Sequence, residues 1–177
     1  MYRIDVLLKQ NRQLFHTNDL SLLWGITNKN TLYTTIKRYV QKGILMSIHK
    51  GFYSTVPIDR INAYKIVQGY LHRYCYISCE TVLFGAGAIS QKGNYITAVS
   101  DVSRKFALGN NAYFVHQLRN DYLYNEYCID NIDSMAVASL ERAVADILYF
   151  APRYHFYNRK VINWKKVKEI QKKVGYI

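Results

Sequence analysis

The sequence lacks the patterns of a transmembrane segment and of a signal peptide. It contains no run of about 18 apolar residues, and the opening Met-Tyr-Arg-Ile-Asp does not resemble a signal peptide. Half of its residues are hydrophobic, which argues against wholesale disorder. We therefore expect a soluble cytoplasmic protein with no membrane partner. Its 177 residues suffice for one large domain or two small ones.

Cysteine is scarce, and its spacing does not favour a metal site. An odd count of three, Cys75, Cys79 and Cys128, without an export signal indicates reduced thiols rather than a disulfide framework. With His72 they form His72-x-x-Cys75-x-x-x-Cys79 and a distant Cys128, which could be imagined as a zinc site. The pattern lacks a Cys-x-x-Cys pair and lies among Tyr, Ile and Val. We expect buried structural thiols, with no metal and no other cofactor.

Motifs for catalysis are also missing. Glu80, Glu141 and Asp146 are expected on helices, and nothing in the sequence pairs them as an acid and a base. Ser139 has no nearby histidine. Gly85-Ala86-Gly87 belongs to neither GxGxxG nor GxxxxGK[ST], so we interpret it as a helix stop. No catalytic residue is assigned, and we expect a protein that is not an enzyme.

Acidic residues are scarce at both ends of the chain, whose net charge is +12. Residues 1–54 hold eight Lys or Arg and two acids, residues 55–154 hold nine of each, and residues 155–177 hold seven and one. An AT-rich genome would enrich Lys and Asn without removing acids from both ends. Two basic ends around a neutral middle therefore indicate localised contacts with a polyanionic partner.

The segment before Gly43 has the pattern of two helices joined by a short turn. The first is expected to begin at Thr17, whose hydroxyl would cap it, and to end at Gly25. The second begins at Thr27 or Asn28 and ends at Gly43. Two helices joined so closely, the second polar and basic on one side, form the unit that fits a DNA major groove.

The polar side of the second helix has the composition of a DNA-reading surface. Leu32, Ile36 and Val40 share one stripe, and residues 28–43 contain no acid. Asn and Gln pair with adenine edges, Arg and Lys with guanine or phosphate, and Thr with either. The opposite face therefore predicts base contacts by Asn30, Thr34, Arg38 and Gln41. An ordinary surface helix in a small helical domain is the alternative.

A hairpin is expected directly after this helix. Residues 44–48 and 52–54 form two short strands around His49-Lys50-Gly51, and a basic tip would reach a backbone phosphate. This order predicts a winged helix-turn-helix, preceded by a helix within residues 1–14 on which Ile4, Leu7, Leu8 and Leu14 recur at helical spacing. The predicted DNA-binding residues are Lys29, Asn30, Thr31, Thr34, Lys37, Arg38, Gln41, Lys42, His49 and Lys50.

The fold class predicted for the whole chain is α/β (α+β). Residues 1–56 would form the winged helix-turn-helix, and residues 57–177 a mixed α/β domain with mainly antiparallel strands. In that domain we expect helices from Asp59 to Leu71, from Ser78 to Phe84, from Ser139 to Phe150 and from Asn163 to Val174. The expected strands are a short one ending near Ser78 and residues 95–100, 105–108, 113–116 and 122–129.

Two groups of charged residues in this domain lead to further predictions. Arg142 and Asp146 are four residues apart and are expected to pair on the helix surface. The last helix carries a basic face, which is either a solvated surface or a second nucleic-acid contact. Its lysines are Lys165, Lys166, Lys168, Lys172 and Lys173.

Several of these segments, taken in order, resemble the AbiEi-type antitoxins, the regulator half of type IV toxin–antitoxin pairs. The resemblance rests on Phe15-His16-Thr17-Asn18-Asp19-Leu20, Lys50-Gly51-Phe52-Tyr53, Tyr76-Ile77-Ser78-Cys79-Glu80-Thr81-Val82-Leu83 and Ala138-Ser139-Leu140-Glu141-Arg142-Ala143-Val144-Ala145-Asp146. In the last of these Leu140 stands where the family usually has Pro. Together the segments span most of the chain.

The resemblance implies a repressor that binds inverted repeats upstream of its own operon. Its C-terminal domain would counteract a nucleotidyltransferase-like toxin without forming a stable complex with it. A homodimer on double-stranded DNA would match an inverted-repeat operator. Two other classes stay open: an enzyme that processes nucleic acid and uses the winged helix for targeting, and a solo winged-helix regulator or interaction module without a toxin.

Overall fold

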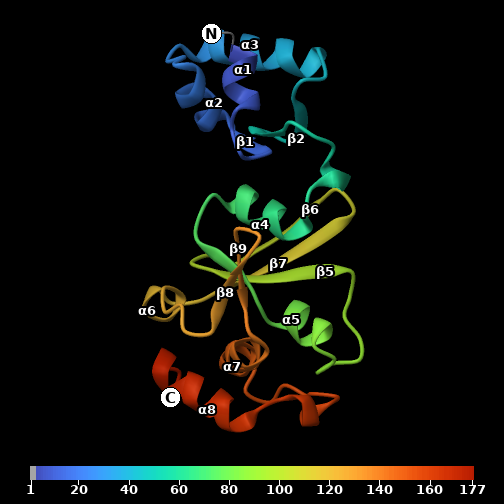
Figure 1. Cartoon of the computed structure of the whole chain (residues 1–177), viewed down its shortest axis with the longest axis vertical. Helices are drawn as coiled ribbons and strands as arrows, with labels where there is room; N and C mark the ends of the chain where they lie inside the picture. The colour runs from blue at the N-terminus through green and yellow to red at the C-terminus, as the bar shows by residue number, and fades with distance from the viewer. Residues whose placement is uncertain (1–2) are drawn as a thin grey trace. The chain divides into compact units, whose positions relative to one another are not determined.

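The computed structural model describes residues 3–177, which form a mixed α/β protein with eight α-helices, two 3₁₀-helices and two β-sheets (Figure 1). The chain divides into two compact units, Met1–Asn62 and Ala63–Ile177. The boundary expected from the sequence lay after residue 56. None of the helices in the described part of the chain has the length and apolar character needed to cross a membrane.

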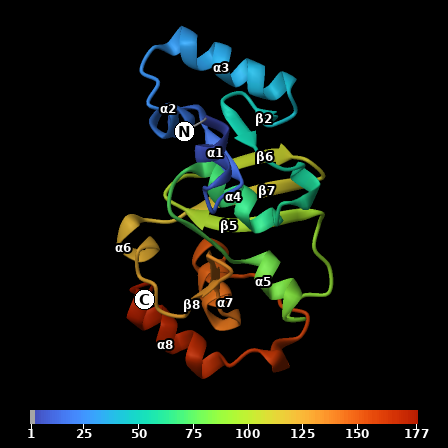
Figure 2. The same ribbon diagram turned by 45° about the horizontal axis from the view of Figure 1, so that its top comes forward.

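The first unit has three main helices and a small antiparallel sheet (Figure 2). Its elements are α1 (Arg3–Leu8), β1 (Leu14–His16), α2 (Thr17–Trp24), α3 (Lys29–Gln41), β2 (Met46–His49), β3 (Phe52–Ser54) and a 3₁₀-helix (Ile58–Arg60). The strand order is β1-β3-β2. The core beneath the helices is apolar, with Phe15, Leu20 and Ile36 almost fully buried. Trp24 stacks on Tyr39 with ring centroids 5.2 Å apart and so joins α2 to α3.

The start of this unit differs from the predicted single helix. α1 ends at Leu8, and Leu14 instead lies in β1, paired with Ser54 of β3. Leu7 is buried as predicted, whereas Leu8 is 65% exposed. The first two residues of the predicted helix lie outside the described part of the chain. The apolar spacing was right for Leu7 but could not reveal that a strand follows.

The residue that caps the start of α2 differs from the one predicted, whereas the residue that ends the helix was predicted correctly. The cap is His16, whose backbone N–H donates to Asp19 Oδ2 at 2.7 Å, so the assignment of Thr17 as cap was wrong. The Thr17 hydroxyl instead donates to the Gly51 carbonyl at 3.4 Å. Gly25 ends the helix as predicted, in the left-handed region with φ +62°, which favours glycine.

The second unit is a six-stranded mixed sheet with helices on both faces. Its strands are β4 (Cys75–Ile77), β5 (Tyr95–Ser100), β6 (Arg104–Leu108), β7 (Asn111–Gln117), β8 (Ile129–Ile132) and β9 (Met135–Ala138). Its helices are α4 (Ala63–Leu71), α5 (Glu80–Gly85), α6 (Asn120–Leu123), α7 (Leu140–Phe150), a 3₁₀-helix (Arg159–Val161) and α8 (Trp164–Val174). The strand order is β6-β7-β5-β4-β9-β8. The pairs β5–β7 and β4–β9 are parallel, and the other three pairs are antiparallel.

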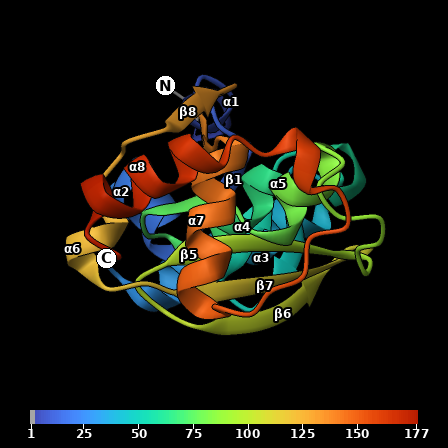
Figure 3. The same ribbon diagram turned by 90° about the horizontal axis from the view of Figure 1, so that it is seen from below.

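The two faces of this sheet are covered by different helices (Figure 3). On one face Tyr70 of α4 lies 4.2 Å, between ring centroids, from Phe106 of β6. On the other, His116 of β7 stacks on Phe150 of α7 at 4.9 Å. α5 and α8 both pack against α7. Residues 96–100 of β5 are buried throughout, as expected for a central strand covered on both sides.

Several sequence-based expectations for this unit were wrong. Asp59 lies in the 3₁₀-helix and does not begin α4, which starts at Ala63. Ser78 does not cap α5, because its hydroxyl donates to Asp146 Oδ2 at 2.7 Å and Cys79 is the cap residue. Residues 122–129, expected as a strand, instead contain the end of α6 and a turn, and only Ile129 lies in a strand, at the start of β8.

Arg142 and Asp146 form a buried ion pair at the centre of this unit, so the prediction of a surface pair was wrong. Arg142 Nε donates to Asp146 Oδ1 at 2.9 Å, and both side chains are fully buried. The remaining guanidinium N–H groups donate to the Tyr76 hydroxyl and to the carbonyls of Tyr122, Asn125 and Tyr127. Burial alone would lower the pKa of Arg142, but the adjacent carboxylate raises it above its ordinary value. The Arg142 guanidinium therefore stays charged in the core.

Burial of several weak acids predicts that this unit unfolds in alkali. Burial raises the pKa of Cys75 and of Tyr113 to about 12, from 9.0 and 10.0. The folded state therefore keeps protons that the unfolded chain loses first. The stabilisation is complete below the unfolded pKa values and is lost as pH rises toward about 12. Urea unfolding at a series of alkaline pH values should show this decline, and Tyr113→Phe should reduce its slope by up to about 1.4 kcal/mol per pH unit. An unchanged slope in this variant would contradict the assignment.

Candidate nucleic-acid interface

α3 is held in the first unit by its apolar stripe and by a cap at its start. Leu32 and Ile36 are 5% and 3% exposed, while Val40 is only half-buried. The Asn28 side chain accepts a hydrogen bond from the Thr31 N–H at 3.0 Å, so Asn28 begins the helix, one of the two starts that the sequence allowed. Gly43 follows the helix with φ +68°. The opposite face of α3 is therefore presented in a fixed orientation.

All ten residues predicted to bind DNA are exposed on the first unit. Lys29, Asn30, Thr31, Thr34, Lys37, Arg38 and Gln41 lie on α3, Lys42 is its C-terminal cap, His49 ends β2, and Lys50 lies in the following turn. The Thr31 hydroxyl also donates to Asn28 Oδ1 at 3.3 Å, so its hydrogen-bond donor is already used within the cap at the start of α3.

The residues predicted to contact bases and phosphates occupy different parts of the α3 surface. At about 100° per residue, Asn30, Arg38 and Gln41 lie within about 40° of Thr34 around the helix axis. Lys37 lies about 60° to one side of Thr34 and Lys42 about 80° to the other. A polar strip flanked by two lysines matches the arrangement in which bases are read centrally and phosphates are held on both edges of a groove.

The β2–β3 hairpin is tied to the start of α2. The Thr17 N–H donates to the Gly51 carbonyl at 3.0 Å. Gly51 has φ +76°, and a Cβ there would lie 3.3 Å from Thr17 Oγ1, so any larger residue would be strained. Beside it the exposed side chains of His49 and Lys50 mark the tip. The tip is therefore held in a defined position within the unit.

The charge on this surface is not neutralised by nearby acids. No acidic residue occurs between Asp19 and Asp59 in the sequence. Asp19 is already engaged by Arg12, with Nη2 and Oδ2 3.3 Å apart. Within residues 3–177 no ion pair involves Lys29, Lys37, Arg38, Lys42 or Lys50. The exposed cations therefore give this face a positive potential that attracts a polyanion.

The basic face of α8 in the second unit is less open. Lys166 lies 3.7 Å from Glu141, and Lys173 lies 3.0 Å from Glu169, measured between charged atoms. Lys165, Lys168 and Lys172 are exposed without an ion pair among the described residues. Partial neutralisation makes α8 a weaker candidate for nucleic-acid contact than α3.

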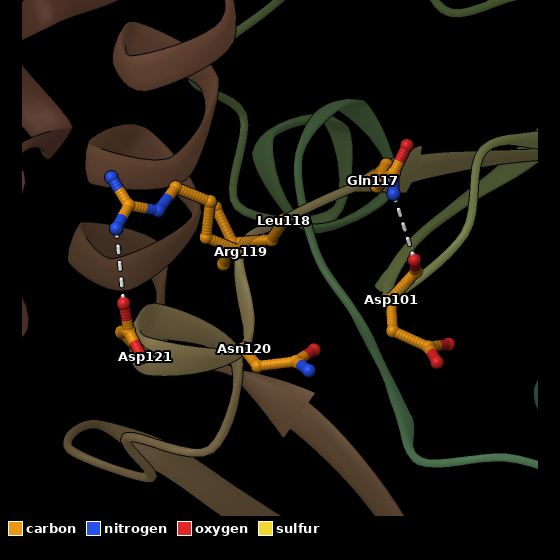
Figure 4. Close-up of a pocket in the computed structure, with 6 residues that line it drawn as sticks. All are labelled: Asp101, Gln117, Leu118, Arg119, Asn120 and Asp121. Atoms are coloured by element: carbon orange, nitrogen blue, oxygen red, sulfur yellow. Dashed lines mark hydrogen bonds and ion pairs between the residues drawn. The ribbon is translucent and has the colours of Figure 1, made fainter.

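A hollow of about 380 Å³ in the second unit lies where β5 and β7 end (Figure 4). It is lined by Asp101, Gln117, Leu118, Arg119, Asn120 and Asp121. Arg119 is paired with Asp121 at 3.0 Å, and the Gln117 amide donates to the Asp101 carbonyl. With its one cation paired and two acids in its wall, this hollow does not suit a polyanion.

Two features that bear on function were not predicted from the sequence. Tyr33 of α3 is 55% exposed and borders its polar face. In the second unit, Cys79, Glu80 and His116 come together, although His116 lies 36 positions after Glu80 in the sequence. The angular position of Tyr33 hinted at the first feature, whereas no local pattern could have shown the second.

A scan against models of protein families found no match, and a search of curated proteins found no similar sequence. The resemblance to AbiEi-type antitoxins thus stays a prediction that depends on the segments quoted from the sequence.

Proposed function

We propose that the chain is a sequence-specific DNA-binding repressor whose first unit is a winged helix-turn-helix. The observation that carries the proposal is the exposed, acid-free face of α3 with the basic hairpin tip directly after it. The order α1-β1-α2-α3-β2-β3 and the three-stranded sheet support the winged-helix assignment. In this arrangement α3 enters the major groove and Lys50 reaches a neighbouring phosphate.

The proposed biological role is that of the autoregulating antitoxin of a type IV toxin–antitoxin pair. Support for this role comes from the resemblance of four segments to the AbiEi-type family, the last of which contains Arg142 and Asp146. The second unit would then counteract a nucleotidyltransferase-like toxin without a stable complex. Co-expression with a candidate toxin encoded beside the gene tests this part, since growth should be restored without the two proteins co-purifying.

Fluorescence anisotropy tests DNA binding directly. The duplex upstream of the protein's own gene is compared with a shuffled duplex across a salt series. We expect a preference of roughly a thousandfold for the upstream duplex and weaker binding as salt rises. Equal, steeply salt-dependent binding to both would indicate a charged patch without sequence reading. Absence of salt-dependent binding would favour a protein-interaction module instead.

Arg38 should contribute to base reading rather than to general attraction. Arg38→Ala is expected to cost about 1–3 kcal/mol on the preferred duplex and to relax the preference at one base position. The reason is its place beside Thr34 at the centre of the exposed face. Binding of the variant to single-substitution duplexes measures the effect. Equal weakening on every duplex would assign Arg38 to a phosphate.

A further inference from the structure

Three metal-ligating side chains of the second unit meet at the start of α5. The Cys79 thiol, a Glu80 carboxylate oxygen and a His116 ring nitrogen all lie within 4.8 Å of one another. Cys79 is fully buried, and the other two are half-buried. None of the three belongs to the proposed DNA surface.

The sheet register explains how distant residues come together. His116 of β7 is aligned with Val99 of β5, and Val99 is aligned with Tyr76 of β4. Aligned residues in neighbouring strands share a face of the sheet. That face is the one covered by α7, where His116 stacks on Phe150. Cys79 follows three residues after Tyr76, so the turn from β4 into α5 brings it to the same face.

The turn that carries Cys79 and Glu80 is fixed by buried hydrogen bonds. The Thr97 hydroxyl donates to the Ser78 carbonyl at 2.6 Å and accepts from the Thr81 N–H at 2.9 Å. The Thr97 N–H in turn donates to Thr81 Oγ1 at 2.8 Å, and Ser78 is bonded to Asp146. These bonds fix the backbone on either side of Cys79 and Glu80, so the turn presents both side chains in a defined position.

Glu80 and His116 keep unused ligand capacity. Glu80 Oε2 is buried without a hydrogen-bond partner, and a buried acceptor left in this way is costly. The ring nitrogens of His116 have no hydrogen bond among the described residues. Lys92 uses its ammonium group on the Tyr95 carbonyl and makes no ion pair with Glu80 within residues 3–177.

We propose that Cys79, Glu80 and His116 form a binding site for a divalent transition metal ion, with Zn²⁺ the best match. Thiolate, imidazole and carboxylate are the ligands that Zn²⁺ takes in proteins, and Mg²⁺ or Ca²⁺ would not select a thiolate. With bonds of about 2.0–2.3 Å, tetrahedral ligand atoms lie about 3.3–3.8 Å apart, so the cluster needs only a small closure. Three protein ligands leave one position for water.

The same residues do not suit a nucleophilic thiol. Cys79 has φ +55° between a strand and a helix and a histidine nearby, which gives some likeness to the nucleophile turn of hydrolases. Its side chain is fully buried, however, so a substrate chain could not reach it. Reactive cysteines lie in partly exposed sites. A metal ion, which needs no access for a substrate chain, fits the site better.

Titration with Co²⁺ tests the proposal on the full-length protein after removal of metals with a chelator. We expect one equivalent to bind and to give thiolate-to-cobalt charge-transfer absorption that Zn²⁺ then abolishes by displacement. Binding replaces the thiol proton, which is released to solvent. Zn²⁺ should also raise the melting temperature of the protein, because it binds only the folded state. This experiment is independent of DNA binding.

Variants separate this site from adventitious binding. Cys79→Ser should lose the charge-transfer absorption, and His116→Gln and Glu80→Gln should weaken Co²⁺ binding by at least about tenfold. Cys128→Ser, which removes a half-buried thiol outside the cluster, should bind like the original protein. If Cys79→Ser does not fold by circular dichroism, His116→Gln decides, since its side chain is only half-buried. Charge transfer that survives in Cys79→Ser, unchanged affinity in His116→Gln, or no charge transfer in the original protein would overturn the proposal.

Discussion

Replacing Arg142 with Met is expected to lower the free energy of unfolding of the second unit by about 3–5 kcal/mol. The substitution leaves the Asp146 carboxylate charged in a site where it is fully buried. It also removes the donors that serve the Tyr76 hydroxyl and three backbone carbonyls. A carboxylate that has lost its counter-ion in the core is much more costly than a lost surface contact, because water cannot replace the guanidinium.

Urea unfolding followed by tryptophan fluorescence measures this effect. The chain has two tryptophans, Trp24 in the first unit and Trp164 in the second, so a Trp24→Phe background reports on the second unit alone. Arg119→Met is the matched control, since its partner Asp121 lies 3.0 Å away but both side chains are well exposed. Exposed pairs contribute about 0–1 kcal/mol. Equal losses in Arg142→Met and Arg119→Met would show that burial of the first pair does not matter.

The double variant Arg142→Met with Asp146→Leu separates the charge from the other contacts. Removing both partners takes away the uncompensated charge, so part of the stability should return. Recovery should be incomplete, because Ser78 and Tyr176 both donate to Asp146 and lose their acceptor. A double variant as unstable as Arg142→Met would mean that the lost hydrogen bonds to carbonyls dominate. With the single variant Asp146→Leu, these variants complete a cycle that measures the coupling between the two charges.

Elements with local signals were predicted closely from the sequence. Ser139 caps α7 by accepting from the Arg142 N–H at 3.2 Å, and Asn163 caps α8 in the same way at 3.1 Å. The bounds of β5 were also confirmed at Tyr95 and Ser100. In each case a short stretch of side chains sets the backbone conformation, so neighbouring residues alone carry the information.

Elements without a recognisable local signal were missed. The β8–β9 hairpin turns at Asp133 and Ser134, both with positive φ, and carries no glycine to mark it. The segment around Tyr122 has aromatic residues typical of strands, yet its carbonyls face Arg142, which lies far along the chain. These carbonyls accept from a buried guanidinium instead of from a neighbouring strand. No window of local sequence shows such a requirement.

The same distinction applies to the candidate sites. The exposed face of α3 follows from helical periodicity within a single segment, so Thr34 and Arg38 could be placed on it from the sequence. The cluster of Cys79, Glu80 and His116 depends on β5 lying between β4 and β7. That strand order is a property of the whole sheet. The spacing of His72 and Cys75 in the sequence argued against a zinc site. It carried no information about His116, which the sheet brings close to Cys79 and Glu80.

Reversing two charges at the edges of α3 is expected to reduce binding to the upstream duplex by about 4 kcal/mol, roughly a thousandfold. The variant is Lys37→Glu with Lys42→Glu, which keeps the central residues Asn30, Thr34 and Arg38. Both lysines are exposed and outside any ion pair in the described chain, so the change costs DNA contact without removing a stabilising partner. Two phosphate contacts become two repulsions, and the salt dependence of binding should become shallower.

The matched control carries the same change of charge on α8, as Lys165→Glu with Lys168→Glu. These lysines are also exposed and unpaired within residues 3–177. Because each variant changes two lysines to glutamates, both variants have the same net charge. If long-range attraction alone governs binding, the two variants weaken it equally. If α3 lies in the groove, only the α3 variant loses affinity on the order of a thousandfold, while the α8 variant changes mainly the association rate. Anisotropy and stopped-flow measurements on both duplexes distinguish these cases, and an α8 effect as large as that of α3 would contradict the placement of α3 in the groove.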